Sequence, residues 1–182
     1  MVPAGKQPRS IPWLQLVVVA LGCFALARLG LLFTTVNGHA SPVWPATGLG
    51  LAALLLGGPR LWPAVGIAVF AATLLNKGTV FVASLQAAGS TLEALVGAAL
   101  MRRFALRDGR FEHYKDLVVL ISASIVACAI SATIGIASIV INGTIQRAEA
   151  SHAWMTWWVG DLLGALEAYG SRVRALNASR LR

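Results

Sequence analysis

The segment SPVWPATGLGLAALLLGG, residues 41–58, places two prolines and a tryptophan directly before a run of apolar residues. Pro42 and Pro45 have no backbone N–H to donate, so within lipid each is tolerated only at a helix start or where the backbone faces protein or water. Trp44 between them favours the membrane–water interface, where its ring is buried and its indole N–H stays hydrated. The segment therefore predicts a broken entry into a membrane helix, together with a candidate recognition surface.

The composition of the whole chain places that segment in an integral membrane protein. Of the 182 residues, 57% are hydrophobic and only 12% are charged, and the mean hydropathy is +0.73. Ordinary soluble domains do not reach such values, so we predict an all-α fold with the lipid bilayer as its surroundings. The net charge of +8 does not indicate nucleic acid as a partner, because the basic residues lie between apolar segments and form no single patch.

Apolar runs in the sequence predict a polytopic helical bundle with about six membrane segments. They cover residues 12–34, 44–57, 60–75, 79–101, 116–141 and 154–166. Because about 20 helical residues are needed to cross the hydrocarbon core, the second, third and sixth segments are short. The turn signal GGPR, residues 57–60, separates the second segment from the third, and we expect these two to form a short helical hairpin. A re-entrant pair that never reaches the far side is the alternative.

Residues 12–166 form the predicted membrane domain, and the flanking sequences form two tails. Residues 1–11 carry Lys6 and Arg9 and imitate the start of a signal peptide. The apolar run that follows is too long for a signal peptide, so we expect a retained first span. Residues 167–182 are polar and basic with apolar residues at loose helical spacing, as expected for a juxtamembrane helix.

Basic residues are distributed unequally between the two predicted membrane faces. Alternate connections place twelve lysines and arginines on one side and only Lys77 and Arg147 on the other. Because cytoplasmic loops carry the excess of lysine and arginine, we expect both termini and the 102–116 loop in the cytoplasm. The connection that carries His39 and Trp44 then faces outward.

Three charged side chains lie inside the predicted spans, away from their ends: Arg28, Glu93 and Asp161. Each costs about 2.5 to 3.5 kcal/mol if it is left at the bilayer centre, so these groups should face one another or a cavity. At about 1.5 Å per helical residue, Arg28 and Asp161 lie about 10 Å below the outer surface, and Glu93 lies deeper. An ion pair between Arg28 and Asp161 is therefore geometrically feasible. It either fixes helix register or serves ligand binding or signal relay.

Two further features lie near the predicted outer surface. His39 could bind a ligand, coordinate a metal or sense pH, or could be a polar loop residue without such a role. The run from Trp154 to Trp158 is typical of the aromatic belt at a membrane interface, with a tryptophan-lined ligand pocket closed by Asp161 as the alternative. The candidate ligand-binding or signal-relay residues are thus Arg28, His39, Trp44, Glu93, Trp158 and Asp161.

No motif for metal, nucleotide or catalytic chemistry stands out in the sequence. We therefore expect no metal site, no cofactor and no enzymatic activity. Cys23 and Cys128 lie in apolar segments without metal-ligand spacing and are expected to be small buried side chains. Gly160 and Gly164 form a GxxxG pair, for which we expect packing inside the bundle, with a homodimer as the other candidate assembly.

Four stretches of the chain resemble, in the same order, the MASE1 family of bacterial membrane-associated sensor domains. They are 41–48 (SPVWPATG), 58–63 (GPRLWP), 91–95 (TLEAL) and 157–164 (WWVGDLLG). The resemblance covers about residues 12–166 and implies a sensory module of the bacterial inner membrane that precedes a cytoplasmic output domain. That output is a histidine kinase of a two-component system, or a diguanylate cyclase or phosphodiesterase of cyclic di-GMP signalling. Family members usually continue through further apolar spans, whereas a polar tail begins here at Glu167. We therefore expect a C-terminally truncated member whose output domain is absent, with a gene remnant or a stand-alone module that signals through a partner as the alternatives.

The chain is accordingly predicted to be a sensory input module that binds a small ligand or a membrane partner protein from the periplasmic side. Two alternatives stay open. A transporter, or the substrate-capture subunit of one, also uses broken helices and intramembrane charges. A structural membrane anchor that binds a partner would use the basic loop at 102–115 to contact anionic lipid.

Overall fold

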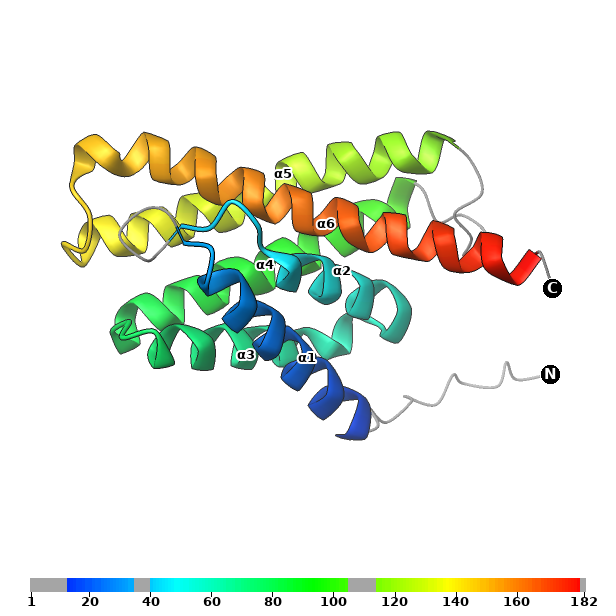
Figure 1. Ribbon diagram of the computed structural model, residues 1–182, viewed down its shortest axis with the longest axis horizontal. Helices are drawn as coiled ribbons and strands as arrows, with labels where there is room; N and C mark the ends of the chain where they lie inside the picture. The colour runs from blue at the N-terminus through cyan, green and yellow to red at the C-terminus, as the bar shows by residue number, and fades with distance from the viewer. Residues whose placement is uncertain (1–12, 35–39, 105–113, 181–182) are drawn as a thin grey trace, which may run out of the picture.

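The computed structural model describes residues 13–34, 40–104 and 114–180, with side chains described in these ranges except at 114–116 and 168–180. The secondary structure in these ranges is helical (Figure 1). Its elements are α1 (Trp13–Leu31), α2 (Pro45–Gly57), the 3-10 turn η1 (Pro59–Leu61), α3 (Trp62–Leu75), α4 (Val80–Phe104), α5 (Tyr114–Ile141), the 3-10 turn η2 (Arg147–Glu149) and α6 (Ala150–Arg180). Three stretches are long and apolar enough to cross a membrane, namely α1, α4 and residues Leu117–Ile141 of α5. The chain is therefore a helical membrane protein.

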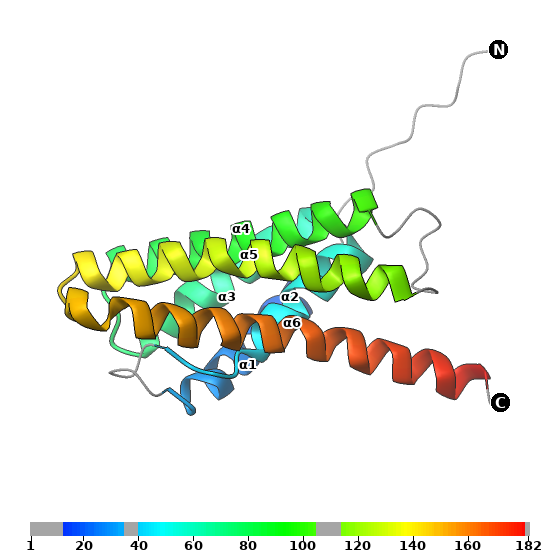
Figure 2. The same cartoon turned by 90° about the horizontal axis from the view of Figure 1, so that it is seen from above.

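The helices form an open ring, and α2 lies in the gap between its two ends, α6 and α1. Around the ring α1 packs on α3, α3 on α4, α4 on α5 and α5 on α6, while α2 lies between α6 and α1 and also reaches α4. Figures 1 and 2 show that α1 begins and α6 ends at one end of the molecule, here called the proximal end. The turn between α2 and α3 lies towards the proximal end, and the α3–α4 and α5–α6 turns lie at the opposite, distal end (Figure 1). The α2–α3, α3–α4 and α5–α6 turns, which the structure describes, therefore lie at the ends that the alternating assignment of connections assumes.

Helix α2 is a half-length helix preceded by extended chain. It has only 13 residues and is therefore about 20 Å long, too short for the hydrocarbon core of a bilayer. Pro45 occupies its first turn, where a missing N–H leaves no hydrogen bond unmade. Ala40 and Ser41, in the segment that leads to it, are buried, so this irregular backbone is covered by protein. The broken helix entry predicted from the two prolines is present.

The turn of the predicted hairpin between α2 and α3 is present, but beyond the turn the two helices pack mainly on other helices. Gly58 adopts φ 101, a conformation that other residues rarely tolerate. From there the helices diverge: Gly50 faces Val65, but α2 packs mainly on α6 and α1, and α3 mainly on α4 and α1. The Arg102 guanidinium of α4 donates to the Leu54 carbonyl oxygen, close to the C-terminus of α2. A cation in this position compensates the negative end of the helix dipole.

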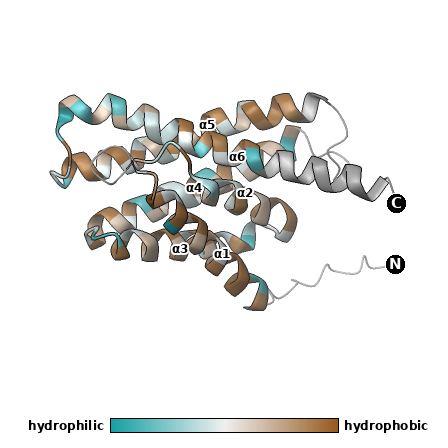
Figure 3. Ribbon diagram, viewed as in Figure 1, coloured by the Kyte–Doolittle hydropathy of each residue, from teal (hydrophilic) through white to brown (hydrophobic). Residues whose placement is uncertain are grey.

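Hydrophobic side chains cover much of the outer surface as well as the core. Leu14, Leu21 and Ile67 are all more than half exposed, at 74%, 63% and 57%. Helix α1 is coloured largely as hydrophobic in Figure 3. Such exposure is unfavourable in water and favourable against lipid chains, in agreement with the membrane assignment.

The core contains a polar layer between two apolar clusters. The proximal cluster includes Leu54 and Met101, and the distal cluster includes Val82 and Ile139. Along α4, buried polar side chains separate the residues that belong to the two clusters. They are Gln86, Ser90, Thr91 and Glu93. The candidate site lies in this layer.

Candidate functional site

Gly160 and Gly164 of α6 form the surface on which the extended segment before α2 lies. The backbone N–H of Trp44 donates to the Gly160 carbonyl oxygen over 3.2 Å. A Cβ atom at Gly160 would collide with the carbonyl oxygen of Ser41, and one at Gly164 with that of Trp44. The GxxxG pair therefore packs inside the bundle, as expected, and the Pro/Trp-rich entry is the partner that it contacts.

Trp44 lies at the centre of this contact and also touches α1. Its ring covers Gly30 so closely that a Cβ at that glycine would approach Cε3 of Trp44 to 2.7 Å. The Ser41 hydroxyl donates to the Val43 carbonyl oxygen at 2.9 Å and accepts from the Val43 N–H at 3.3 Å. The entry segment thus satisfies its backbone partly through its own serine and partly through α6, which is what allows irregular backbone inside the bundle.

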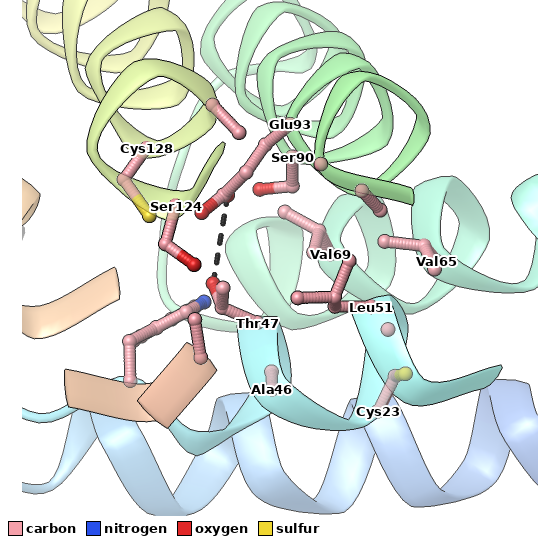
Figure 4. A pocket seen from close by; sticks show the side chains of 16 residues that line it. Cys23, Ala46, Thr47, Leu51, Val65, Val69, Ser90, Glu93, Ser124 and Cys128 are labelled. Carbon is pink, nitrogen blue, oxygen red and sulfur yellow. Dashed lines mark hydrogen bonds between the residues drawn. The ribbon is translucent and has the colours of Figure 1, made fainter. Parts of the chain in front are cut away.

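Thr47, in the first turn of α2, joins two carboxyl groups from other helices. Its Oγ1 lies 3.1 Å from Oδ1 of Asp161 on α6 and 3.5 Å from Oε2 of Glu93 on α4. A hydroxyl carries one hydrogen and donates to one carboxyl at a time, so the shorter contact to Asp161 is the stronger bond. Figure 4 shows the Thr47 and Glu93 side chains pointing toward each other. One hydroxyl therefore links α2, α4 and α6.

Both carboxyl groups are deeply buried and incompletely hydrogen-bonded. Glu93 is 3% exposed and Asp161 is 1% exposed. Oε1 of Glu93 and Oδ2 of Asp161 have no hydrogen-bond partner. Within the ranges that the structure describes, no lysine or arginine forms an ion pair with either group. Buried acids that lack partners are costly, and inside a membrane protein they mark a functional site more often than a purely structural contact.

A cavity of about 20 Å³ adjoins Glu93 on the proximal side of this junction. We call it the proximal cavity, and Figure 4 shows its lining. Its lining residues with side-chain oxygen atoms are Thr47, Ser90, Glu93 and Ser124, and apolar side chains together with Cys23 and Cys128 supply most of the rest. Both cysteines are free and buried, as predicted. The space suffices for a single water-sized occupant and not for an organic ligand.

A second cavity of about 20 Å³, the distal cavity, adjoins Asp161. Its polar lining residues are Ser41, Thr73, Asn76, Gln86 and Asp161, and Trp44 and Trp157 contribute indole rings. Oε1 of Gln86 accepts from the Thr73 hydroxyl at 2.9 Å, but Nε2 of Gln86 is buried without a partner. Because Asn76 lies in the distal turn after α3, this cavity extends the polar layer from Asp161 toward the distal end.

The predicted ion pair between Arg28 and Asp161 is not formed. Oδ1 of Asp161 is bonded to Thr47, and Nη1 of Arg28 is buried without a partner. The reason is the position of α2, which packs against both α1 and α6 and lies between them. Asp161 also lies deeper in the bundle than predicted, because α6 begins at Ala150, about one turn before the predicted start. At about 1.5 Å per residue, Asp161 lies about 17 Å and Glu93 about 20 Å from the distal ends of their helices, so the two acids are at one level.

The tryptophans of α6 divide between two environments. Trp158 donates from its indole N–H to the Ile125 carbonyl oxygen of α5 at 3.1 Å and stacks on Trp154 with ring centroids 5.8 Å apart. It lines neither cavity, whereas Trp157 lines the distal cavity beside Asp161. Of the six predicted residues, the structure brings together Trp44, Glu93 and Asp161; His39 lies outside the described residues.

Several polar and aromatic side chains of the site were missed in the sequence, among them Thr47, Gln86, Ser124 and Trp157. For Gln86 and Ser124 the sequence does contain a signal. Each belongs to a set of polar or small residues spaced four and then three positions apart in an otherwise apolar helix. On α4 they are Gln86, Ser90 and Glu93, and on α5 they are Ser124, Cys128 and Ser131. This spacing places each set on one helix face, which is the face turned to the polar layer. Among the His, Cys, Asp and Glu residues that the structure describes, no group of three is placed to hold a metal ion.

Comparison with known proteins connects this geometry to one family model. The model described as MASE1 matches residues 13–168, a range that contains every side chain of both cavities. No curated protein and no solved structure matches the chain.

Proposed function

Because the chain belongs to the MASE1 family of membrane-associated sensor domains, we propose that it is the sensory input module of a bacterial signalling protein of the inner membrane. A small ligand or a membrane partner protein acts on it from the periplasmic side. The response passes to a cytoplasmic output, either a histidine kinase or a diguanylate cyclase or phosphodiesterase. The module itself performs no catalysis.

The proposed orientation places the proximal end in the cytoplasm, with all six helices entering or crossing the bilayer. The arginines at the proximal end are Arg60 in η1, Arg102 and Arg103 at the end of α4, and Arg172, Arg174 and Arg180 in the last part of α6. Lys77 and Arg147, in the α3–α4 and α5–α6 connections, belong to the distal end. The excess of positive charge at the proximal end supports this orientation, since cytoplasmic loops are enriched in lysine and arginine.

The observation that carries the proposal is the position of Asp161 on α6. This acid is bonded to the first turn of α2, and α6 continues from it to Arg180, about 29 Å farther along the helix. A continuous helix thus links the buried junction to the proximal end. A ligand that binds two arrangements of the junction with different affinity would change the position of α6 at its C-terminal end.

The test is an output measurement on the full chain joined through α6 to a histidine kinase domain in a bacterial reporter strain. We expect Trp44→Ala, Glu93→Gln and Asp161→Asn each to change the output about fivefold or more, the lower range of ordinary coupling energies. Trp62→Ala and Glu149→Gln are the matched controls, since Trp62 is 49% exposed and Glu149 is exposed on the distal connection. Unchanged output from all three junction variants, at normal membrane abundance, would reject the proposal.

Ion-coupled transport is a second candidate function because a half-length helix begins at the buried carboxyl pair. Transporters place such helix starts and intramembrane acids at their binding sites. Uptake into vesicles that contain the purified chain separates the two functions. Uptake that is lost in Asp161→Asn would favour transport, and a response of the fused kinase without uptake would favour the sensor.

A further inference from the structure

The carboxyl pair and the proximal cavity suggest the chemical class of a ligand. We propose that the proximal cavity binds one small monovalent cation of about the size of sodium, held by the carboxylate of Glu93 and the hydroxyl oxygens of Thr47 and Ser124. This names a ligand for the junction described above. Its consequence for signalling rests on the proposed sensor function, whereas the binding itself does not.

The first argument is electrostatic. Glu93 and Asp161 share the Thr47 hydroxyl, the Ser131 hydroxyl also lies against both acids, and each acid keeps one oxygen without a hydrogen bond. Arg28 lies on the far side of α2, and no other basic side chain among those described pairs with either acid. Two ionised carboxylates in this dry layer would repel each other without compensation. A proton on each acid would neutralise the pair, and so would one proton together with one monovalent cation; the sodium-binding experiment below distinguishes the two.

The second argument is the presence of a third oxygen that also lacks a partner. The Ser124 side chain is 2% exposed, and its Oγ forms no hydrogen bond. It lines the same cavity as Glu93, whose Oε1 also has no partner. Figure 4 shows Ser124, Glu93 and Thr47 converging on one region between α5, α4 and α2. A serine on an apolar helix ordinarily bonds the carbonyl four residues earlier, as Ser122 of the same helix does with Val118. The Ser124 oxygen is instead left available to a cavity occupant.

The size and ligand count of the cavity select the class of occupant. Its volume of about 20 Å³ holds one water-sized species and excludes organic molecules. Calcium takes about six to eight oxygen ligands, and magnesium keeps several of its waters, so neither fits a site with so few oxygens and so little room. A monovalent cation with a partial shell of hard oxygen atoms matches the space, the ligands and the charge.

The distal cavity lies on the side of the junction that faces the distal end. Asn76, Gln86 and Asp161 line it, and Trp44 borders both cavities. A cation that enters from the distal end would pass Asp161 and Thr47 before it reaches Glu93. Trp44 lines both cavities and therefore lies next to the junction that separates them.

The test is equilibrium binding of radioactive sodium to the purified full chain in detergent, in choline buffer at fixed pH. We expect saturable binding of about one sodium per chain, displaced by unlabelled sodium and not by choline. Glu93→Gln and Ser124→Ala should each weaken it about tenfold or more, a loss of about 1.4 kcal/mol. Glu167→Gln, which removes an exposed acid from the same helix as Asp161, should leave it unchanged. Size-exclusion profile and tryptophan emission verify the fold of each variant.

The outcomes separate the cation site from the sensor proposal. Absence of saturable sodium binding by the folded wild-type chain overturns the cation site, as does unaltered affinity in Ser124→Ala together with Glu93→Gln. If Glu93→Gln does not fold, Ser124→Ala alone decides, because it removes one hydroxyl and no charge. Sodium binding without any effect of sodium on the fused kinase supports the site and overturns its role in signalling. Junction variants that change kinase output in a chain that binds no sodium leave the sensor proposal standing and reject the cation.

Discussion

Replacement of Thr47 by valine tests whether one hydroxyl holds the junction of α2, α4 and α6. Valine has nearly the shape of threonine but carries a methyl group in place of the hydroxyl, so the change removes the donor and little volume. Asp161 loses its 3.1 Å hydrogen bond, and both carboxyl groups are left without the shared donor. The local apolar contacts stay the same, and the effect therefore reports the polar link.

The expected magnitude follows from the burial of these groups. A buried polar group that loses its hydrogen-bond partner costs about 1 to 3 kcal/mol, and an acceptor that is 1% exposed has no water to replace the lost donor. We expect Thr47→Val to lower the free energy of unfolding by about 2 kcal/mol. For a chain of this length that corresponds to a fall of about 4 to 8 °C in the midpoint of thermal unfolding.

The assay is thermal unfolding in detergent, followed by tryptophan emission and by the folded fraction in size-exclusion chromatography. Thr91→Val is the matched control, since the Thr91 hydroxyl only donates to the Ala87 carbonyl oxygen of its own helix, at 2.7 Å. It should shift the midpoint by about 1 °C or less, because such bonds within a helix add little stability. Equal shifts in the two variants, or no shift in Thr47→Val, would refute the role given to the hydroxyl.

Two further substitutions probe the packing around the junction. Gly160→Ala and Gly164→Ala should strongly reduce the yield of folded protein in size-exclusion chromatography, because each Cβ would collide with backbone of the entry segment, whereas Gly89→Ala should be tolerated with its nearest contact at 3.4 Å. Normal yield from both α6 variants would contradict the close approach. Arg102→Gln should lower the thermal midpoint by about 2 to 4 °C, equivalent to about 1 kcal/mol, by removing the cation at the end of α2. Arg103 is its exposed neighbour, and Arg103→Gln should leave the thermal midpoint unchanged. Equal effects of the two substitutions would argue against a specific contact of Arg102 with Leu54.

Much of the helical architecture was predictable, because local signals determine it. Apolar runs located the helices, and the GGPR turn at 57–60 separated α2 from α3. Pro42 in the entry segment and Pro45 in the first turn marked where α2 begins. Gly160 and Gly164 indicated close packing, although their partner could not be read from the helix that carries them.

The composition of the site was less predictable because it depends on contacts between distant segments. Asp161 was paired with Arg28 since both lie near one end of a span, but the half-length α2 lies between their helices and Thr47 takes the contact. Its depth was underestimated because the apolar run starts at Trp154, whereas the helix starts about a turn earlier. A capping box between Gln146 and Glu149 marks that earlier start and could have corrected the estimate.

A double-mutant cycle of Glu93→Gln and Asp161→Asn tests the central claim most directly, which is that these two acids form one linked site. The measurement is the free energy of unfolding in detergent for the wild type, the two single variants and the double variant. Groups that share a donor in a dry layer should couple, so we expect the effect of the double variant to differ from the sum of the single effects by about 1 kcal/mol or more. The same cycle with Glu93→Gln and Glu167→Gln should be additive. Additivity of Glu93→Gln with Asp161→Asn, in variants that fold normally, would contradict the account.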